Sequence, residues 1–71
     1  MRITYDKEAD ALYVQLKEDE VEESVEISDG IILDLDKSKN PLGIEFLYVS
    51  RRLSSEDLAK VSLENLTFAT R

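Results

Sequence analysis

Apolar and polar residues alternate with a period of two along most of the first fifty residues. This alternation is typical of β-strands that bury one face and leave the other in water. Five runs show it, at residues 2–5, 12–17, 21–28, 31–36 and 42–49. The residues predicted to point inward are Ile3, Leu12, Val14, Leu16, Val25, Ile27, Leu33, Leu35, Ile44 and Phe46. Because the links are short, we expect neighbouring strands to pair as an antiparallel meander.

Turn and capping residues lie between and after these runs. Asp29-Gly30 has the chemistry of a two-residue hairpin turn of type I′. Ser54 and Asp57 occupy the positions of a capping box, which predicts one short helix over about residues 55–61. The segment 62–71 is compatible with helix, strand or coil. The predicted fold class is therefore α+β, mainly an antiparallel β-meander of about five strands with one short C-terminal helix, in a single domain over residues 1–71.

The chain has 71 residues and contains neither histidine nor cysteine. This composition excludes disulfides, thiolate and imidazole metal sites, and nucleophilic mechanisms that need a histidine base. We therefore predict no catalytic residues, no cofactor and no required metal. A core this small is marginal, so we also expect a homo-oligomer, most simply a dimer. The fifth run is apolar on both sides, and Leu63, Leu66 and Phe68 are apolar residues that need a surface. These are candidate dimer contacts.

Negative charge is concentrated in the N-terminal half. Residues 1–36 carry 12 acids and 3 bases, a net charge of −9, whereas residues 37–71 carry 4 acids and 6 bases, a net charge of +2. Six of the acids lie within residues 18–26. Such a surface repels phosphate backbones, which disfavours nucleic acid, and attracts a small basic protein. The alternative is an acidic face that serves solubility alone. The candidate contacts for a basic partner are Glu20, Glu22, Glu23 and the outward-facing Tyr13.

Several short motifs occur together in this chain. They are Tyr5-Asp6, Ala9-Asp10, Leu12-Tyr13, Gly30, and Gly43-Ile44-Glu45 followed by Ser50. In order and spacing they resemble the small domain of unknown function 2283 family, over about residues 3–50. The resemblance implies a family-like β-sheet over residues 1–50, followed by a helix and tail over 51–71. It brings no established activity, but genes of similar bacterial and archaeal proteins often lie beside small toxin-like reading frames. The resemblance thus implies an antitoxin-like role.

Two groups of carboxylates are the alternative sites. Asp34, Asp36, Ser38, Asn40 and Glu45 match positions of a calcium-loop template, but Lys39 replaces its glycine and the flanks alternate as strands do. Asp6 and Asp10 bracket one turn, where carboxylates cap backbone N–H groups or hold a cation. Whether either group binds an ion stays open at this point.

The sequence therefore favours a non-catalytic protein-interaction module, antitoxin-like in role, with a small basic partner. The alternative is a carboxylate-based binder of a metal or small ligand, or an enzyme of that kind. No apolar run is long enough to span a bilayer, and the N-terminal segment lacks the apolar core of a signal peptide. We accordingly expect no membrane association and a cytoplasmic location.

Overall fold

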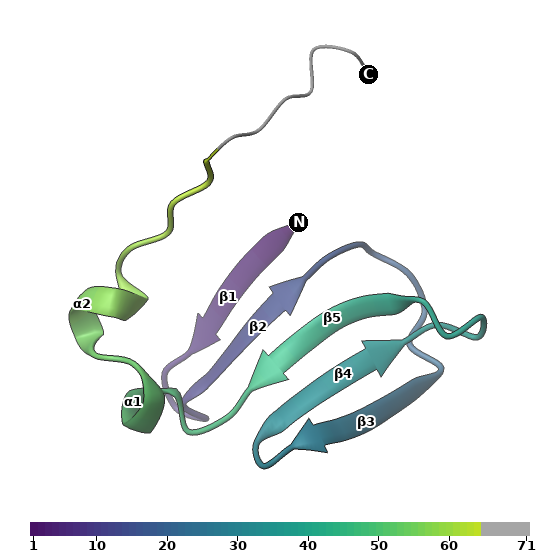
Figure 1. Ribbon diagram of the computed structural model, residues 1–71, viewed down its shortest axis with the longest axis horizontal. Coiled ribbons are helices and arrows are strands. Elements are labelled where there is room, and N and C mark those ends of the chain that lie inside the picture. The colour runs from purple at the N-terminus through teal and green to yellow at the C-terminus, as the bar shows by residue number, and fades with distance from the viewer. Residues whose placement is uncertain (65–71) are drawn as a thin grey trace.

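The computed structural model describes residues 1–64. Five strands form one antiparallel sheet in the order β1-β2-β5-β4-β3 (Figure 1). Their bounds are β1 Arg2–Asp6, β2 Ala11–Gln15, β3 Glu23–Ser28, β4 Ile31–Leu35 and β5 Pro41–Phe46. Two short helices follow, α1 (Val49–Arg52) and α2 (Ser55–Leu58). The predicted α+β class with a five-stranded antiparallel sheet is confirmed, and no described helix is long and apolar enough to cross a membrane.

The order of the strands departs from the prediction at one place. β2 pairs with β5, not with β3, so the expected pairing of β2 with its successor is wrong. The link between them, residues 16–22, instead carries the chain past the ends of β5 and β4 to the far edge (Figure 1). β3 is exposed throughout and contains Glu23 and Glu26, which suits an edge. β5 contains the buried Leu42, and it occupies the centre of the sheet.

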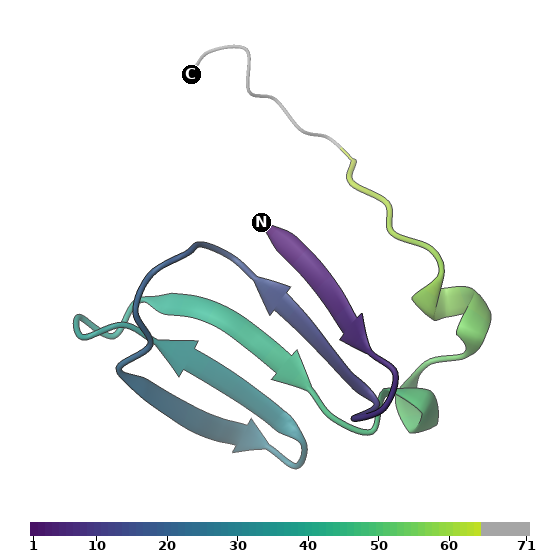
Figure 2. The ribbon, with the colours of Figure 1, turned by 180° about the vertical axis from the view of Figure 1, so that it is seen from behind.

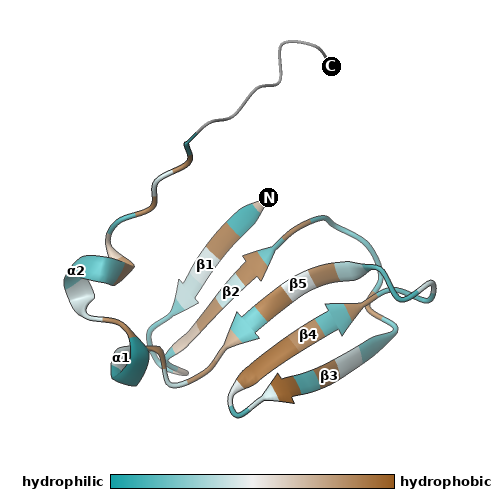
Figure 3. Cartoon of the chain, in the orientation of Figure 1, coloured by the Kyte–Doolittle hydropathy of each residue, from teal (hydrophilic) through white to brown (hydrophobic). Residues whose placement is uncertain are grey.

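The strand register sorts the side chains onto two faces. One continuous row of partners, Ile3, Val14, Ile44, Leu33 and Val25, crosses all five strands. A second row on the same face consists of Tyr5, Leu12, Phe46 and Ile31. We call these two rows the apolar face. Hydrophobic residues, brown in Figure 3, are frequent along β2, β4 and β5. The predicted side assignment of Ile3, Leu12, Val14, Val25, Leu33, Ile44 and Phe46 is confirmed.

One of the predicted inward positions fails. Ile27 lies at a register irregularity between Glu26 and Ser28 and is 56% exposed, because the extra residue breaks the alternation. Leu16 follows the end of β2 and is 37% exposed, as much as Val25. Leu35 is half-buried at the end of β4, where it pairs with Glu23. The opposite side of the sheet, which we call the polar face, carries the rows Arg2-Gln15-Gly43-Asp34-Ser24 and Thr4-Tyr13-Glu45-Ile32-Glu26.

The turn between β3 and β4 also differs from the prediction. Type I′ needs positive φ at both central residues. Gly30 has φ +72°, whereas Asp29 does not have a positive φ, so the turn is not type I′. A side chain at Gly30 would meet the Arg52 guanidinium at 2.8 Å. That guanidinium donates to the carbonyl oxygens of Leu47 and Asp29, at 2.9 and 2.5 Å, and so ties α1 to this turn.

Both helices lie at one end of the sheet (Figures 1 and 2). α1 was not predicted; its Val49 is one of three buried apolar residues of the described chain, with Ala11 and Leu42. α2 begins at Ser55 as predicted, and its capping box of Ser54 and Asp57 is confirmed. It ends at Leu58, short of residue 61, because no residue of α2 is buried and a helix this short depends on packing.

Candidate interaction surfaces

The carboxylate of Asp10 joins the β1–β2 turn to the start of α1. It accepts hydrogen bonds from the Tyr5 hydroxyl at 2.8 Å, the Ser50 hydroxyl at 2.7 Å and the Ser50 N–H at 3.0 Å. Asp10 itself adopts a left-handed backbone, with φ 53°, and its carbonyl accepts from the Val49 N–H. The three residues form a clamp between segments about forty residues apart, which we call the Asp10 clamp.

The electrostatics of the Asp10 clamp favour a structural role. The hydrogen bonds from Ser50, and then that from Tyr5, lower the pKa of Asp10. The hydrogen bond to Asp10 in turn raises the pKa of the Tyr5 phenol. The carboxylate is the common acceptor of these donors and so joins the β1–β2 turn to α1. The neighbouring Asp6 caps its own turn by accepting from the N–H groups of Glu8 and Ala9.

A second cluster lies on the polar face. The Tyr13 hydroxyl donates to Asp34 at 2.8 Å, and the Ser24 hydroxyl donates to the other oxygen of the same carboxylate at 2.6 Å. The Tyr13 ring reaches Asp34 by lying over Gly43 of β5, where any Cβ would overlap it. Burial, and then the bond to Asp34, raise the pKa of Tyr13. Gly43 thus provides the bare backbone that the ring covers.

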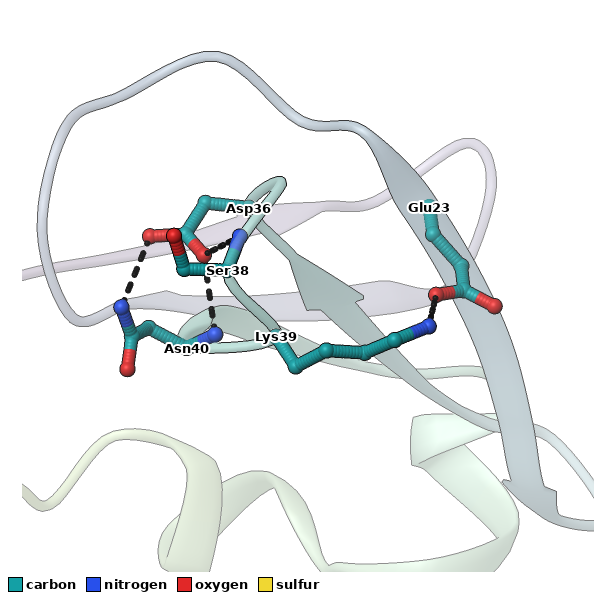
Figure 4. A network of polar contacts seen from close by, with 5 residues as sticks. All are labelled: Glu23, Asp36, Ser38, Lys39 and Asn40. Atoms are coloured by element: carbon teal, nitrogen blue, oxygen red, sulfur yellow. Dashed lines mark hydrogen bonds and ion pairs between the residues drawn. The ribbon is translucent and has the colours of Figure 1, made fainter.

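The loop between β4 and β5 is held by Asp36 (Figure 4). Its carboxylate accepts from the N–H groups of Ser38 at 2.8 Å and Asn40 at 2.9 Å, and from the Asn40 side-chain amide at 3.2 Å. The bonds from Asn40 and Ser38 lower the pKa of Asp36. Lys39, with φ 69°, reaches β3 and pairs with Glu23 at 2.7 Å, which raises the pKa of Lys39.

These contacts separate the residues of the calcium-loop pattern. Asp34 bonds to Tyr13 and Ser24 on the polar face, whereas Asp36 is turned into its own loop. Over residues 1–64, no three acidic side chains are grouped so that they could hold a metal ion.

An acidic hollow lies at the opposite end of the sheet from the helices. It encloses about 350 Å³. Asp19, Glu20 and Glu22 of the β2–β3 link line it together with Asp36, Lys37 and Ser38 of the β4–β5 loop. Two segments distant in sequence thus place four carboxylates and one ammonium group around a single concavity. We call this the acidic hollow.

The residues predicted as contacts therefore have different surroundings. Glu20 and Glu22 line the acidic hollow, and Glu23 lies beside it on β3, paired with Lys39. Tyr13 does face outward but is half-buried and bonded to Asp34, so it is less free than predicted. Leu63 is 67% exposed. Leu66 and Phe68 lie outside the described residues.

A shallow apolar hollow of about 270 Å³ opens at the helix end of the apolar face. Its walls come from Leu12, Ile31 and Phe46 of the sheet and from Val49, Arg52 and Leu53 in and after α1. α1 therefore covers one end of the second row of the apolar face.

A family model described as Protein of unknown function (DUF2283) matches residues 2–50. The chain belongs to this family. No curated protein and no solved structure shows a significant match to the chain. The motif residues by which the chain resembles DUF2283 converge in the structure: Tyr5, Asp10 and Ser50 form the Asp10 clamp, while Tyr13 and Gly43 form the Tyr13 cluster with Asp34. The sequence did not indicate that Asp34 would bond to Tyr13 or that Arg52 would bond to the β3–β4 turn. Gly43, a glycine within a predicted strand, was the available signal for the Tyr13 cluster.

Proposed function

We propose that this DUF2283 protein is a non-catalytic protein-interaction module that binds a small basic protein at the acidic hollow. The observation that carries the proposal is the convergence of Asp19, Glu20 and Glu22 with Asp36 around one concavity. Glu20 and Glu22 are exposed, so each can meet a cationic side chain of a partner. The concavity can receive a lysine or arginine, and the surrounding charge orients the partner as it approaches.

Two further features support a binding role over catalysis. Asp10, Asp34 and Asp36 accept hydrogen bonds from donors of the chain itself and so maintain its turns and sheet. The carboxylates at Glu20 and Glu22 lie instead at the surface, at the end of the sheet away from both helices. An antitoxin-like protein with this surface would act by occlusion, covering the basic patch with which its partner binds RNA.

The test measures association with the product of an adjacent small reading frame in the source genome, provided that product is basic. The variant is the triple Glu20→Lys, Glu22→Lys, Glu23→Lys. The matched control changes Glu8, Glu56 and Glu64 to Lys, which alters the net charge equally at exposed positions outside the acidic hollow. We expect the first variant to lower the association rate about tenfold or more at low salt, and the control far less.

The salt dependence of the association rate is a second measurement. The difference between the two variants should shrink as the Debye length falls below about 8 Å. Equal losses in both variants would mean that only net charge matters, and would contradict the proposed site. Unchanged binding in the first variant would contradict it as well.

A further inference from the structure

Within residues 1–64, no second layer covers most of the apolar face. The row Ile3, Val14, Ile44, Leu33 and Val25 crosses all five strands, yet none of these residues is buried: Ile3 is 40% exposed and Val25 37%. Both ribbon views place the two helices at one end of the sheet (Figures 1 and 2), and no residue of this row lines the apolar hollow beside α1. Domains bury such a face against another layer, because aliphatic side chains left in water forgo the favourable free energy of burial.

We infer that a second copy of this chain covers the apolar face, so that two sheets stack into a two-layer dimer. The inference goes beyond the proposed function, since it concerns the uncharged apolar face and not the acidic hollow. Two sheets packed in this way lie about 10 Å apart, and a two-fold axis lets each row meet its counterpart.

The distribution of charge favours a second copy as the occupant. Among the strand residues, Glu23 is the one charged residue on the side of the apolar face, and it lies on an edge strand beside Lys39. Asp34, Glu26 and Glu45 all lie on the polar face. Two chains of net charge −7 can therefore meet through this face with few like charges opposed, which stacking through the polar face would not allow.

The area is sufficient for a small dimer. Five strands spaced about 4.8 Å apart and about 18 Å long present a face of roughly 400 Å² in projection. A corrugated layer of side chains exposes more than its projection, so two copies bury on the order of 1,000 Å², at the lower end for specific interfaces. A neutral apolar face also gives a basic partner no charge to pair with, so that partner fits the acidic hollow instead.

Two single substitutions on one central strand test the inference. Ile44→Lys puts a charge in the middle of the apolar face, and Glu45→Lys puts the same side chain on the adjacent residue of the polar face. We expect light scattering to give a dimer for the wild type and for Glu45→Lys, and loss of the dimer for Ile44→Lys. A folded Ile44→Lys variant that remains dimeric overturns the inference.

Because Ile44→Lys could unfold the chain, a second measurement uses the wild type alone. The thermal midpoint of a two-layer dimer rises with protein concentration, since dissociation exposes the face. A midpoint independent of concentration, with a monomeric mass, overturns the inference and points to cover by the chain's own C-terminal segment. Deletion of residues 62–71 tests the alternative that the C-terminal segment forms the dimer interface. We expect the shortened protein to remain dimeric, and loss of the dimer would place the interface in that segment instead.

Discussion

Gly43 and Tyr13 permit a quantitative test of how the polar face is built. No positive φ is required at Gly43, so alanine fits its backbone, and the nearest atoms that a Cβ would meet belong to the Tyr13 ring and hydroxyl. Gly43→Ala should therefore displace Tyr13 and break its 2.8 Å bond to Asp34. The lost bond to a partly exposed carboxylate costs about 1.5 kcal/mol, and the lost ring packing about 1 kcal/mol.

An alanine in a strand also gains about 0.5 kcal/mol over glycine, because it loses less conformational entropy on folding. Gly43→Ala alone should thus destabilise the protein by about 2 kcal/mol. In a Tyr13→Ala background the ring is gone, so the same substitution should stabilise by about 0.5 kcal/mol. The coupling between the two positions is the difference, about 2.5 kcal/mol, within the range measured for residues in contact.

Urea unfolding of the wild type, the two single variants and the double variant measures this coupling. All four proteins must be compared at one protein concentration, because assembly would add to the apparent stability. Additive effects, or Gly43→Ala being equally destabilising in both backgrounds, would show that Tyr13 does not depend on the bare backbone of Gly43.

Three further predictions concern other parts of the fold. Gly30→Ala should destabilise by about 1–2 kcal/mol in urea unfolding, because φ +72° is strained for alanine and Arg52 must move; a neutral result would contradict the described turn. Leu42→Ala should cost about 2–5 kcal/mol in the same assay, since Leu42 is 1% exposed, and a loss below about 1 kcal/mol would mean that this site is not core. Asp10→Asn should lower the thermal midpoint near neutral pH. The pKa of Asp10 is lowered in the fold, so its carboxylate stabilises the protein only while it is ionised, and the difference in thermal midpoint from the wild type should narrow below about pH 4. A difference that is constant with pH would refute this.

The alternation of side chains predicted the two faces of the sheet well, because period two fixes which residues share a face whatever the strand order. The order itself depends on which strands bury most against each other. β5 pairs with both β2 and β4, and no local pattern in the link over residues 16–22 indicates that β2 bypasses β3. The irregularity at Ile27 was hidden for a similar reason, since the alternation continues through it in sequence.

The clusters of the candidate site were only partly predictable. Asp10 was recognised as a turn residue, but its partner Ser50 lies forty residues away, and so the helix that it anchors was missed. Tyr13 was expected to face outward, and it lies on the polar face, but its bond to Asp34 depends on the register across β5. Local chemistry thus predicts caps and turns, whereas contacts between strands require the register.

The stacking of two apolar faces is the central claim about how this protein assembles, and contacts between copies test it most directly. Mixing isotope-labelled with unlabelled protein allows nuclear Overhauser effects between copies to be measured separately from those within one. The account predicts intermolecular effects from the methyl groups of Val14, Leu33 and Ile44, which lie in one row across β2, β5 and β4. Intermolecular effects confined to the polar face or to residues after α2, or none at all, would contradict it.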